Sequence, residues 1–222
     1  MLLLLAGCPA KPATPGPAPD LPPPGLYTGF TVEFTGAGAG GDRLDLLVLV
    51  DDSSTMDQEQ ASLAASLPDV VQALVTPPDE DGDGRPEWDS VQSLHVGVVS
   101  SDMGTAGYAV PTCDDSELGE DGILQQSPSP AVPGCDATYP LFLTSDNGEP
   151  DPGFPRDFAC IATLGTGGCE FEQPLAAVEK ALTVHSAAGA ANDTFLRADA
   201  LLAIVLVSCP RRSSRGRGQA PG

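Results

Sequence analysis

The sequence predicts an α/β fold: a Rossmann-like, doubly wound sheet whose strands are mostly parallel. Three short runs are almost wholly apolar, at residues 43–50, 93–100 and 201–208. Strands that are buried on both faces of a parallel sheet have this composition. Stretches with the apolar spacing of helices lie between the runs, and strands that alternate with helices along a chain build a parallel sheet covered on both faces.

The first predicted helix follows the run at 43–50. Its apolar positions recur at steps of three and four residues, at Leu63, Leu67, Val70 or Val71, and Leu74. Such spacing gathers apolar side chains on one face of a helix. Pro68 has no backbone N–H and is expected to kink or split this helix.

The second predicted helix precedes the run at 201–208. Its apolar face is expected to carry Phe171, Leu175, Val178, Leu182 and His185. Pro174 falls in the first turn, where a proline is tolerated. Residues 102–158 are rich in Gly, Pro and acidic residues, and we expect a loop-rich insertion there with a short strand at 139–143. Together these elements form one predicted domain over residues 29–208.

The N-terminal segments differ from the predicted domain. Residues 1–8 read MLLLLAGC, an apolar run into Leu-Ala-Gly-Cys that resembles the bacterial lipobox. The resemblance implies a lipoprotein signal remnant, a lipid anchor on Cys8 and an extracytoplasmic place in the bacterial cell envelope, at the outer membrane. Residues 9–28 are proline-rich and predict an extended linker between the anchor and the domain.

Charge separates the C-terminal tail, residues 209–222, from the rest of the chain. The net charge is −21, yet four of the ten basic residues lie in the last twelve positions. The acidic balance argues against nucleic acid or anionic lipid surfaces as partners. We interpret the abrupt basic tail as the product of a truncated or frame-shifted gene, and a natural tail that binds an acidic surface is the alternative.

Four cysteines inside the predicted domain are expected to form disulfides, because an exported protein meets an oxidising environment. Cys160 and Cys169 flank a glycine-containing stretch, and Cys113 and Cys135 bracket an acidic, proline-rich loop. We therefore expect the pairs Cys113–Cys135 and Cys160–Cys169, which leaves Cys209 as the odd one.

The densest group of candidate ligands ends the first strand, in the sequence VDDSSTM at residues 50–56. Ligands of open α/β sheets bind beyond the carboxyl ends of the strands. Asp51, Ser53 and Thr55 alternate there, so a tight loop would turn three oxygens toward one point. Oxygen ligands suit a hard cation, Mg²⁺ or Ca²⁺, with Mn²⁺ as a further candidate. The alternative is that these residues cap the helix that follows.

The run LLVLVDDSSTM resembles the first metal-site loop of von Willebrand factor type A (VWA) domains. That family's pattern is Asp-x-Ser-x-Ser, and Asp51, Ser53 and Thr55 fit it with threonine in the last place. The stretches HVGVVSSDMG and GTGGCEFEQPLAAVEKAL also resemble a bacterial lipoprotein branch of the family. The resemblance covers about residues 42–208, and it implies a bound cation that accepts an acidic side chain from a protein partner.

The chain departs from the VWA pattern in two places. The family's second-loop threonine has no clean counterpart, and Thr166 and Glu170 are the nearest candidate ligands. The aspartate that the family carries after a later strand is absent, because the run at 201–208 continues into Cys209 and Pro210. The expected fold is therefore VWA-like but incomplete at its C-terminus.

A second acidic motif lies at residues 79–87. Asp79, Asp81 and Asp83 alternate before a glycine, which resembles the first half of a calcium loop. Glu87 is the candidate for the glutamate that such a loop needs. A solvated acidic turn is the alternative interpretation.

The function that these observations predict is binding and not catalysis. The chain has no G-x-S-x-G elbow, phosphate-binding loop or dinucleotide fingerprint. We expect a lipid-anchored, extracytoplasmic VWA-like domain that binds a protein ligand through a divalent cation, in cell adhesion or assembly. The alternatives are an accessory fragment of a larger enzyme and a non-functional truncated product.

Overall fold

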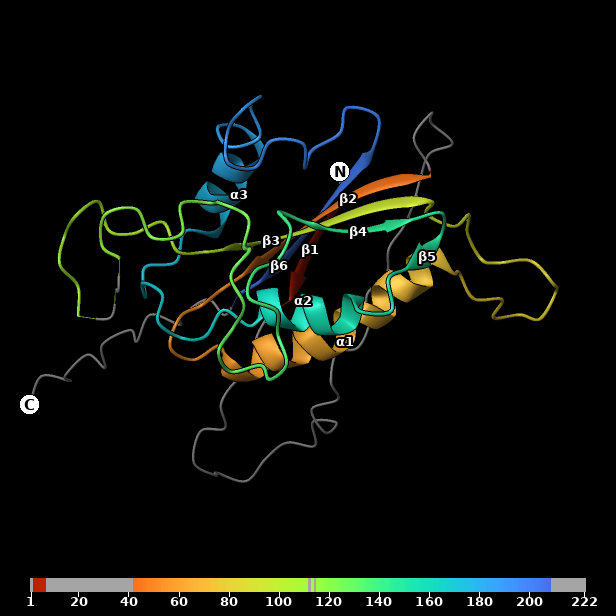
Figure 1. Ribbon diagram of the computed structural model, residues 1–222, viewed down its shortest axis with the longest axis horizontal. Helices are drawn as coiled ribbons and strands as arrows, with labels where there is room; N and C mark the ends of the chain where they lie inside the picture. Colours follow the sequence, from red (N-terminus) through yellow and green to blue (C-terminus); the bar gives the residue numbers. More distant parts are fainter. Residues whose placement is uncertain (1, 7–41, 112, 114, 209–222) are drawn as a thin grey trace, which may run out of the picture.

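The computed structural model describes residues 2–6, 42–111, 113 and 115–208. The candidate lipidation site Cys8, the linker at 9–28 and the basic tail at 209–222 lie outside the described residues. A central sheet carries helices on both of its faces (Figure 1), so the predicted α/β class is confirmed.

A mixed sheet forms the centre of the described part of the chain, with six strands in the order β1-β6-β2-β3-β4-β5. The strands are β1 (Leu2–Ala6), β2 (Arg43–Val50), β3 (Ser93–Ser100), β4 (Leu143–Asp146), β5 (Glu149–Pro150) and β6 (Leu201–Val207). The neighbours β1, β6, β2 and β3 are parallel, whereas β4 and β5 each run antiparallel to the preceding strand. The three apolar runs are therefore β2, β3 and β6, as the sequence predicts.

The N-terminal apolar run, expected as a signal remnant, is part of this sheet. β1 pairs with β6 in parallel register, from Leu2 opposite Ala203 to Ala6 opposite Val207. Because β2 pairs with the other side of β6, both edges of β6 are hydrogen-bonded. β6 is consequently an internal strand.

The short strand expected at 139–143 lies further along the chain, as β4. Leu143 and Ser145 are buried while Thr144 and Asp146 are exposed, which is the alternation of a strand with one covered face. Pro140 has no N–H to donate to a ladder, so a strand centred on it is disfavoured. The predicted boundaries were therefore wrong by several residues.

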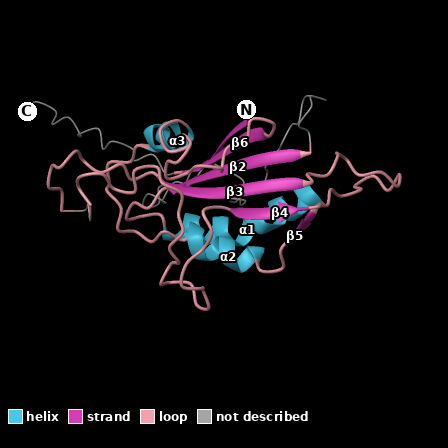
Figure 2. Cartoon of the chain, turned by 45° about the horizontal axis from the view of Figure 1, so that its top comes forward, coloured by secondary structure: helices cyan, strands magenta, loops and turns pink. Residues whose placement is uncertain are grey.

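Three helices cover the sheet in the described part of the chain: α1 (Asp57–Val75), α2 (Phe154–Ala162) and α3 (Pro174–Leu182). α1 and α2 lie together on one face, and α3 covers the other (Figure 2). α1 continues through Pro68, so of the two predicted effects of this proline the split does not occur. Sequence reasoning missed α2, which begins inside the stretch expected to be loops. Among the described residues, none of the helices has both the length and the apolar character needed to cross a membrane.

The buried face of α3 differs from the predicted one. Ala177 and Ala181 are 0% and 1% exposed, whereas Leu175 is 69% exposed and Phe171, which lies before the helix, is 68% exposed. Small side chains let the helix backbone approach the sheet closely, and Val178 and Leu182 pack at the margin of this contact. The larger apolar residues therefore do not define the face that packs.

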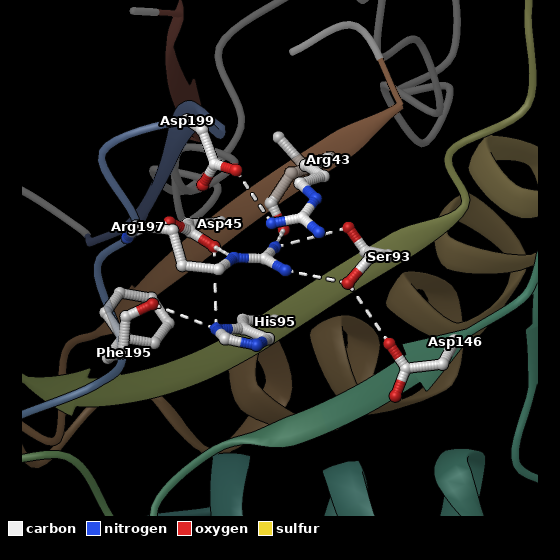
Figure 3. A network of polar contacts seen from close by, with 9 residues as sticks. Arg43, Asp45, Ser93, His95, Asp146, Phe195, Arg197 and Asp199 are labelled. Carbon is white, nitrogen blue, oxygen red and sulfur yellow. Dashed lines mark hydrogen bonds and ion pairs between the residues drawn. The ribbon is translucent and has the colours of Figure 1, made fainter.

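A polar network fastens the amino ends of β2 and β3 to the chain that enters β6 (Figure 3). The Asp45 side chain is fully buried and accepts hydrogen bonds from the Arg197 Nε at 2.8 Å and its backbone N–H at 2.7 Å. The Arg197 guanidinium also donates to Ser93 Oγ at 2.7 Å. Burial lowers the pKa of His95, and the Nδ1 of this ring donates to the Phe195 carbonyl at 2.9 Å. This network holds the sheet together at the end opposite the candidate site.

Candidate metal and ligand site

Asp51 lies where the carboxyl ends of β2 and β6 meet. Its backbone N–H donates to the Val207 carbonyl at 2.9 Å, which extends the pairing of the two strands. Its carboxylate is fully buried, and it accepts hydrogen bonds from the Ser53 N–H at 2.8 Å and the Ser208 hydroxyl at 3.0 Å. The sheet thus fixes the position of Asp51 from two neighbouring strands.

Gln60, on α1, binds the loop that follows β2, and the sequence did not point to it. Its side chain is 1% exposed, and its Nε2 donates to the carbonyls of Asp51 at 2.9 Å and Gly165 at 2.8 Å. Its Oε1 accepts the Gly165 N–H at 3.0 Å. One amide therefore joins the loop after β2 to the loop after α2. The sequence did hold one signal for its burial: Gln60 lies one helical turn before Leu63, the first residue of the apolar stripe, and therefore on the same face of the helix.

The other two predicted metal ligands share this loop but differ in exposure. Ser53 is 2% exposed, while the side chain of Thr55 is exposed. α1 begins at Asp57, and its N-cap is Met56, without a side-chain hydrogen bond. The alternative interpretation, that Ser53 or Thr55 caps the helix, is therefore wrong. That three oxygens from Asp51, Ser53 and Thr55 meet at one cation stays a prediction.

Two further acidic side chains are buried beside Asp51. Asp52 follows it directly and is 6% exposed, and Asp102 follows the end of β3 and is 4% exposed. The Asp102 carboxylate accepts the N–H groups of Gly104 at 2.8 Å and Cys169 at 3.0 Å. Three carboxyl groups are therefore collected at the carboxyl ends of two adjacent strands.

The environment of Asp52 favours its neutral form. Burial raises its pKa from 3.8 to about 7, and the charges of Asp102 and Asp51 add to the increase while a hydrogen bond from Ser100 opposes it. The carboxyl group packs against Gly168, where a Cβ would lie only 2.2 Å from Asp52 Oδ1. Glycine is thus required at position 168 for the Asp52 side chain to occupy its place.

The candidate second-loop residues lie near the first loop, and one of them touches it. The Ser54 hydroxyl donates to Glu170 Oε1 at 2.6 Å. Gly168, two residues earlier, donates its N–H to the Asp52 carbonyl at 3.1 Å. Thr166 is half-buried on the same segment. The structure therefore brings Glu170 to the loop after β2, and the contact is made by Ser54, which the sequence had not singled out.

The acidic loop at 79–87 gathers most of its predicted ligands. Carboxylate oxygens of Asp79, Asp81 and Glu87 all lie within 4.8 Å of one another, and all three residues are exposed. Asp83 does not belong to this group; its Oδ1 accepts the Arg85 N–H at 2.8 Å. Two glycines with left-handed backbone, Gly82 at φ 74° and Gly84 at φ 85°, let the loop wrap around Asp79.

All four predicted disulfide cysteines are paired, but with exchanged partners. The bonds are Cys113–Cys169 and Cys135–Cys160, in place of Cys113–Cys135 and Cys160–Cys169. The fold decides this pairing, because Cys160 lies on α2 while Cys169 lies beside Asp102 on the following loop. Asp102, Cys113 and Cys169 together have the spacing of a metal site, but sulfurs joined in a disulfide are not thiolate ligands.

Comparison of the chain with protein-family models, with curated proteins and with solved structures finds no match. The fold and the site define the protein as an α/β domain with two disulfides and with buried aspartates at the carboxyl ends of β2 and β3.

Proposed function

We propose that this chain binds a divalent cation at the loop of residues 51–55 and uses it to hold an acidic side chain of a protein ligand. The observation that carries the proposal is that Asp51, Asp52 and Asp102 are all buried and all directly follow the ends of the adjacent strands β2 and β3. Ionising carboxyl groups that are buried near one another is costly, and a nearby dication would offset that cost.

The donor chemistry of the loop suits this role. Asp51, Ser53 and Thr55 offer only oxygen, which hard cations such as Mg²⁺, Ca²⁺ and Mn²⁺ prefer. Thr55 is exposed, so a cation beside it would face the solvent and a partner. Such a cation would supply an open coordination position for a carboxylate, which is a binding role in adhesion or assembly. Glu170 or Thr166 would complete the site from the second loop.

The setting proposed for this activity is the bacterial cell envelope. Two disulfides are typical of proteins that fold in an oxidising compartment. The VWA-like family and the lipid anchor on Cys8 belong to the same proposal, on the strength of the motif at residues 51–55 and of the segment at 1–8.

Metal titration of the full chain tests the proposed site. At a concentration of Mg²⁺ or Ca²⁺ about 100 times its Kd, we expect Tm to rise by roughly 5–10 °C, since a ligand that binds only the folded state stabilises it. Thr55→Val removes one exposed oxygen without burying or exposing a charge, and it should reduce this rise.

The matched control is Thr144→Val, which changes an exposed threonine on β4. It should keep the wild-type response to metal. An identical response from Thr55→Val and Thr144→Val would show that the cation does not use this loop.

The loop at 79–87 supports a second, structural role for Ca²⁺. Three exposed carboxylates within 4.8 Å of one another repel at neutral pH, and a calcium ion would relieve the repulsion. Asp81→Asn should weaken Ca²⁺ binding measured by isothermal titration calorimetry, and it should leave the response of the Thr55 loop to Mg²⁺ unchanged. Calcium binding that is the same in Asp81→Asn and in the wild type would favour a solvated acidic turn.

A further inference from the structure

The strand beside β6 comes from the segment that the proposed lipid anchor removes. β1 pairs with β6 in parallel, from Leu2 opposite Ala203 to Ala6 opposite Val207 (Figure 1). A signal peptide is absent from the mature protein, so the anchor proposed on Cys8 requires the loss of residues 1–7. The mature chain would then present this edge of β6 without β1.

The uncovered edge of β6 would accept another strand. The aliphatic residues 203–207, which pair with β1, are 2–7% exposed while it is in place. Without β1, the backbone N–H and C=O groups on that side of β6 lose their partners, and such an apolar edge pairs with a strand of another chain. The opposite edge of the sheet is protected, because β5 consists only of Glu149 and Pro150, a charged residue and one without an N–H.

β1 itself shows which kind of strand fits this edge. Its sequence is LLLLA, five aliphatic residues without a charge, and it runs parallel to β6. A second copy of the chain fits less well. Two copies that each carry a net charge of −21 repel, and a two-fold axis would pair β6 with β6 in antiparallel register. The edge therefore favours an uncharged aliphatic strand of a protein partner.

A strand in this place ends beside the loop of residues 51–55. Val207, opposite Ala6, accepts the Asp51 N–H at 2.9 Å, and the Ser208 hydroxyl donates to the Asp51 carboxylate at 3.0 Å. Neighbouring strands lie about 4.8 Å apart, so a strand added to β6 runs about 10 Å from β2. A cation that bridges two carboxylate oxygens spans about 4–5 Å of this distance, and a glutamate side chain covers the rest.

We propose that the edge of β6 binds an uncharged aliphatic segment of the protein ligand as an added parallel strand, and that an acidic residue directly after this segment reaches the cation. The inference rests on the proposed function, because it uses both the removal of residues 1–7 and the cation at the loop of residues 51–55. It names the class of ligand: a short apolar strand that ends in a carboxylate. β1 occupies the place of this ligand until it is removed.

A chain that is cut after folding tests the proposal. A recognition site for a specific protease is placed in the linker at 9–28, and the full chain is folded before it is cut, so the fold never has to form without β1. A tethered segment competes at an effective concentration on the order of millimolar, whereas a released one competes only at its concentration in solution. The probes are the fluorescent peptides KKLLLLAE, KKLLLLAQ and KKLPLPAE, in which the lysines give solubility. Fluorescence anisotropy measures their affinity, and native mass spectrometry shows whether β1 or a probe is bound.

In Mg²⁺ we expect KKLLLLAE to bind the cut chain and to bind the uncut chain at least about tenfold more weakly, because tethered β1 competes with it. KKLPLPAE should bind the cut chain at least about tenfold more weakly, because proline cannot donate to a strand ladder.

The acidic residue is tested by the second pair of probes. KKLLLLAQ should bind about tenfold more weakly than KKLLLLAE in Mg²⁺ and equally well in EDTA, because an amide is a weaker ligand of a hard cation than a carboxylate is. In the cut chain, Thr55→Val should narrow the difference between these two probes and leave the affinity for KKLLLLAQ unchanged. Thr144→Val is the matched control and should keep the full difference.

The strand site and the cation can fail separately. Equal affinity of the cut chain for KKLLLLAE and KKLPLPAE would overturn the strand site, and so would a dimer of the cut chain without β1, which would assign the edge to a second copy. Equal affinity for KKLLLLAE and KKLLLLAQ, in a chain whose Tm rises with Mg²⁺, would overturn the delivery of the acidic residue to the cation. A Tm that does not respond to metal would instead contradict the proposed cation site, while the preference for KKLLLLAE over KKLPLPAE would still measure the strand site.

Discussion

Asp52 connects the chemistry of the site to the stability of the fold. Its carboxyl group, on the loop after β2, is almost fully buried and packs against Gly168. The charge of Asp102 also acts on it. Burial makes ionisation costly, so the folded chain keeps a proton that the unfolded chain releases. Asp52 alone thereby makes the free energy of unfolding depend on pH between about 4 and about 7.

The first prediction concerns this dependence. The unfolded carboxyl loses its proton near pH 3.8, and the folded one near pH 7. Between these values the folded state binds one proton more, so the free energy of unfolding decreases as pH rises from about 4 to about 7 and levels off above that. Three pH units correspond to about 4 kcal/mol. Urea denaturation at pH 5 and pH 8 in EDTA covers the two units between pH 5 and pH 7, so the expected difference between the two measurements is about 2.7 kcal/mol.

Asp52→Asn cannot ionise, so its decrease in stability over this interval should be smaller than that of the wild type. Asp69→Asn, at an exposed position on α1, is the control and should follow the wild-type profile. A profile of Asp52→Asn that runs parallel to the wild type would contradict the assignment of the effect to Asp52.

Residues of the site were predictable where one segment carries them. The alternating oxygens of Asp51, Ser53 and Thr55 follow a strand that its apolar run already reveals. Asp102 could be anticipated as a loop-orienting residue because it follows the end of the run at 93–100, but its partner Cys169, 67 positions away, could not. The contribution of Gln60 was not predictable, because its partner Gly165 lies 105 positions away in the chain. Ser54 in contact with Glu170, across 116 positions, is a second such case.

At the scale of elements, strands were predicted better than helix faces. β2 and β3 are apolar on both faces, which only a covered parallel sheet explains, so their bounds follow from composition. The buried face of α3 was predicted wrongly, because apolarity ranks leucine above alanine, whereas close packing of the helix on the sheet selects the smaller side chain. Position 177 is packed so tightly that a Cβ on Gly122 would lie 2.7 Å from the Ala177 carbonyl.

The second prediction tests this packing. Ala177→Leu adds a large side chain at a position that is 0% exposed, and it should lower the free energy of unfolding by about 1–3 kcal/mol. Leu175→Ala, two residues earlier but 69% exposed, should change it by less than about 0.5 kcal/mol. Chemical denaturation of both variants gives the comparison, and a larger loss for Leu175→Ala would restore the face expected from the sequence.

At the scale of the whole molecule, distant segments are joined at both ends of the sheet. The Asp45–Arg197 pair at the amino ends spans 152 positions, and it is buried, with side-chain exposures of 0% and 15%. Asp45 interrupts the apolar run of β2, and that interruption was the signal for a buried partner. The identity of that partner, Arg197, could not be predicted, because it lies on the loop before β6 and no local sequence pattern places that loop beside Asp45.

The third prediction follows from this burial. Arg197→Ala leaves the Asp45 carboxylate buried without its partner and should cost about 3–5 kcal/mol of stability. Arg43→Ala removes the exposed pair with Asp199, whose side chains are 45% and 63% exposed, and should cost at most about 1 kcal/mol. Thermal and urea unfolding measure both variants. Similar losses from the two would mean that the buried network contributes no more than a surface ion pair.

The two disulfides also limit how far the chain can be stretched when force is applied to its ends. Cys135–Cys160 lies inside the segment closed by Cys113–Cys169, which encloses 56 positions of sequence. A pull applied across the domain would separate β2, β3 and β6 but leave this segment, which contains β4, β5 and α2, closed by its disulfide. The stretched chain would therefore be shorter by about 190 Å at 3.4 Å per residue. Under force, such a domain would lose the pairing of β2, β3 and β6 first, while the loop beside Asp102 stayed closed.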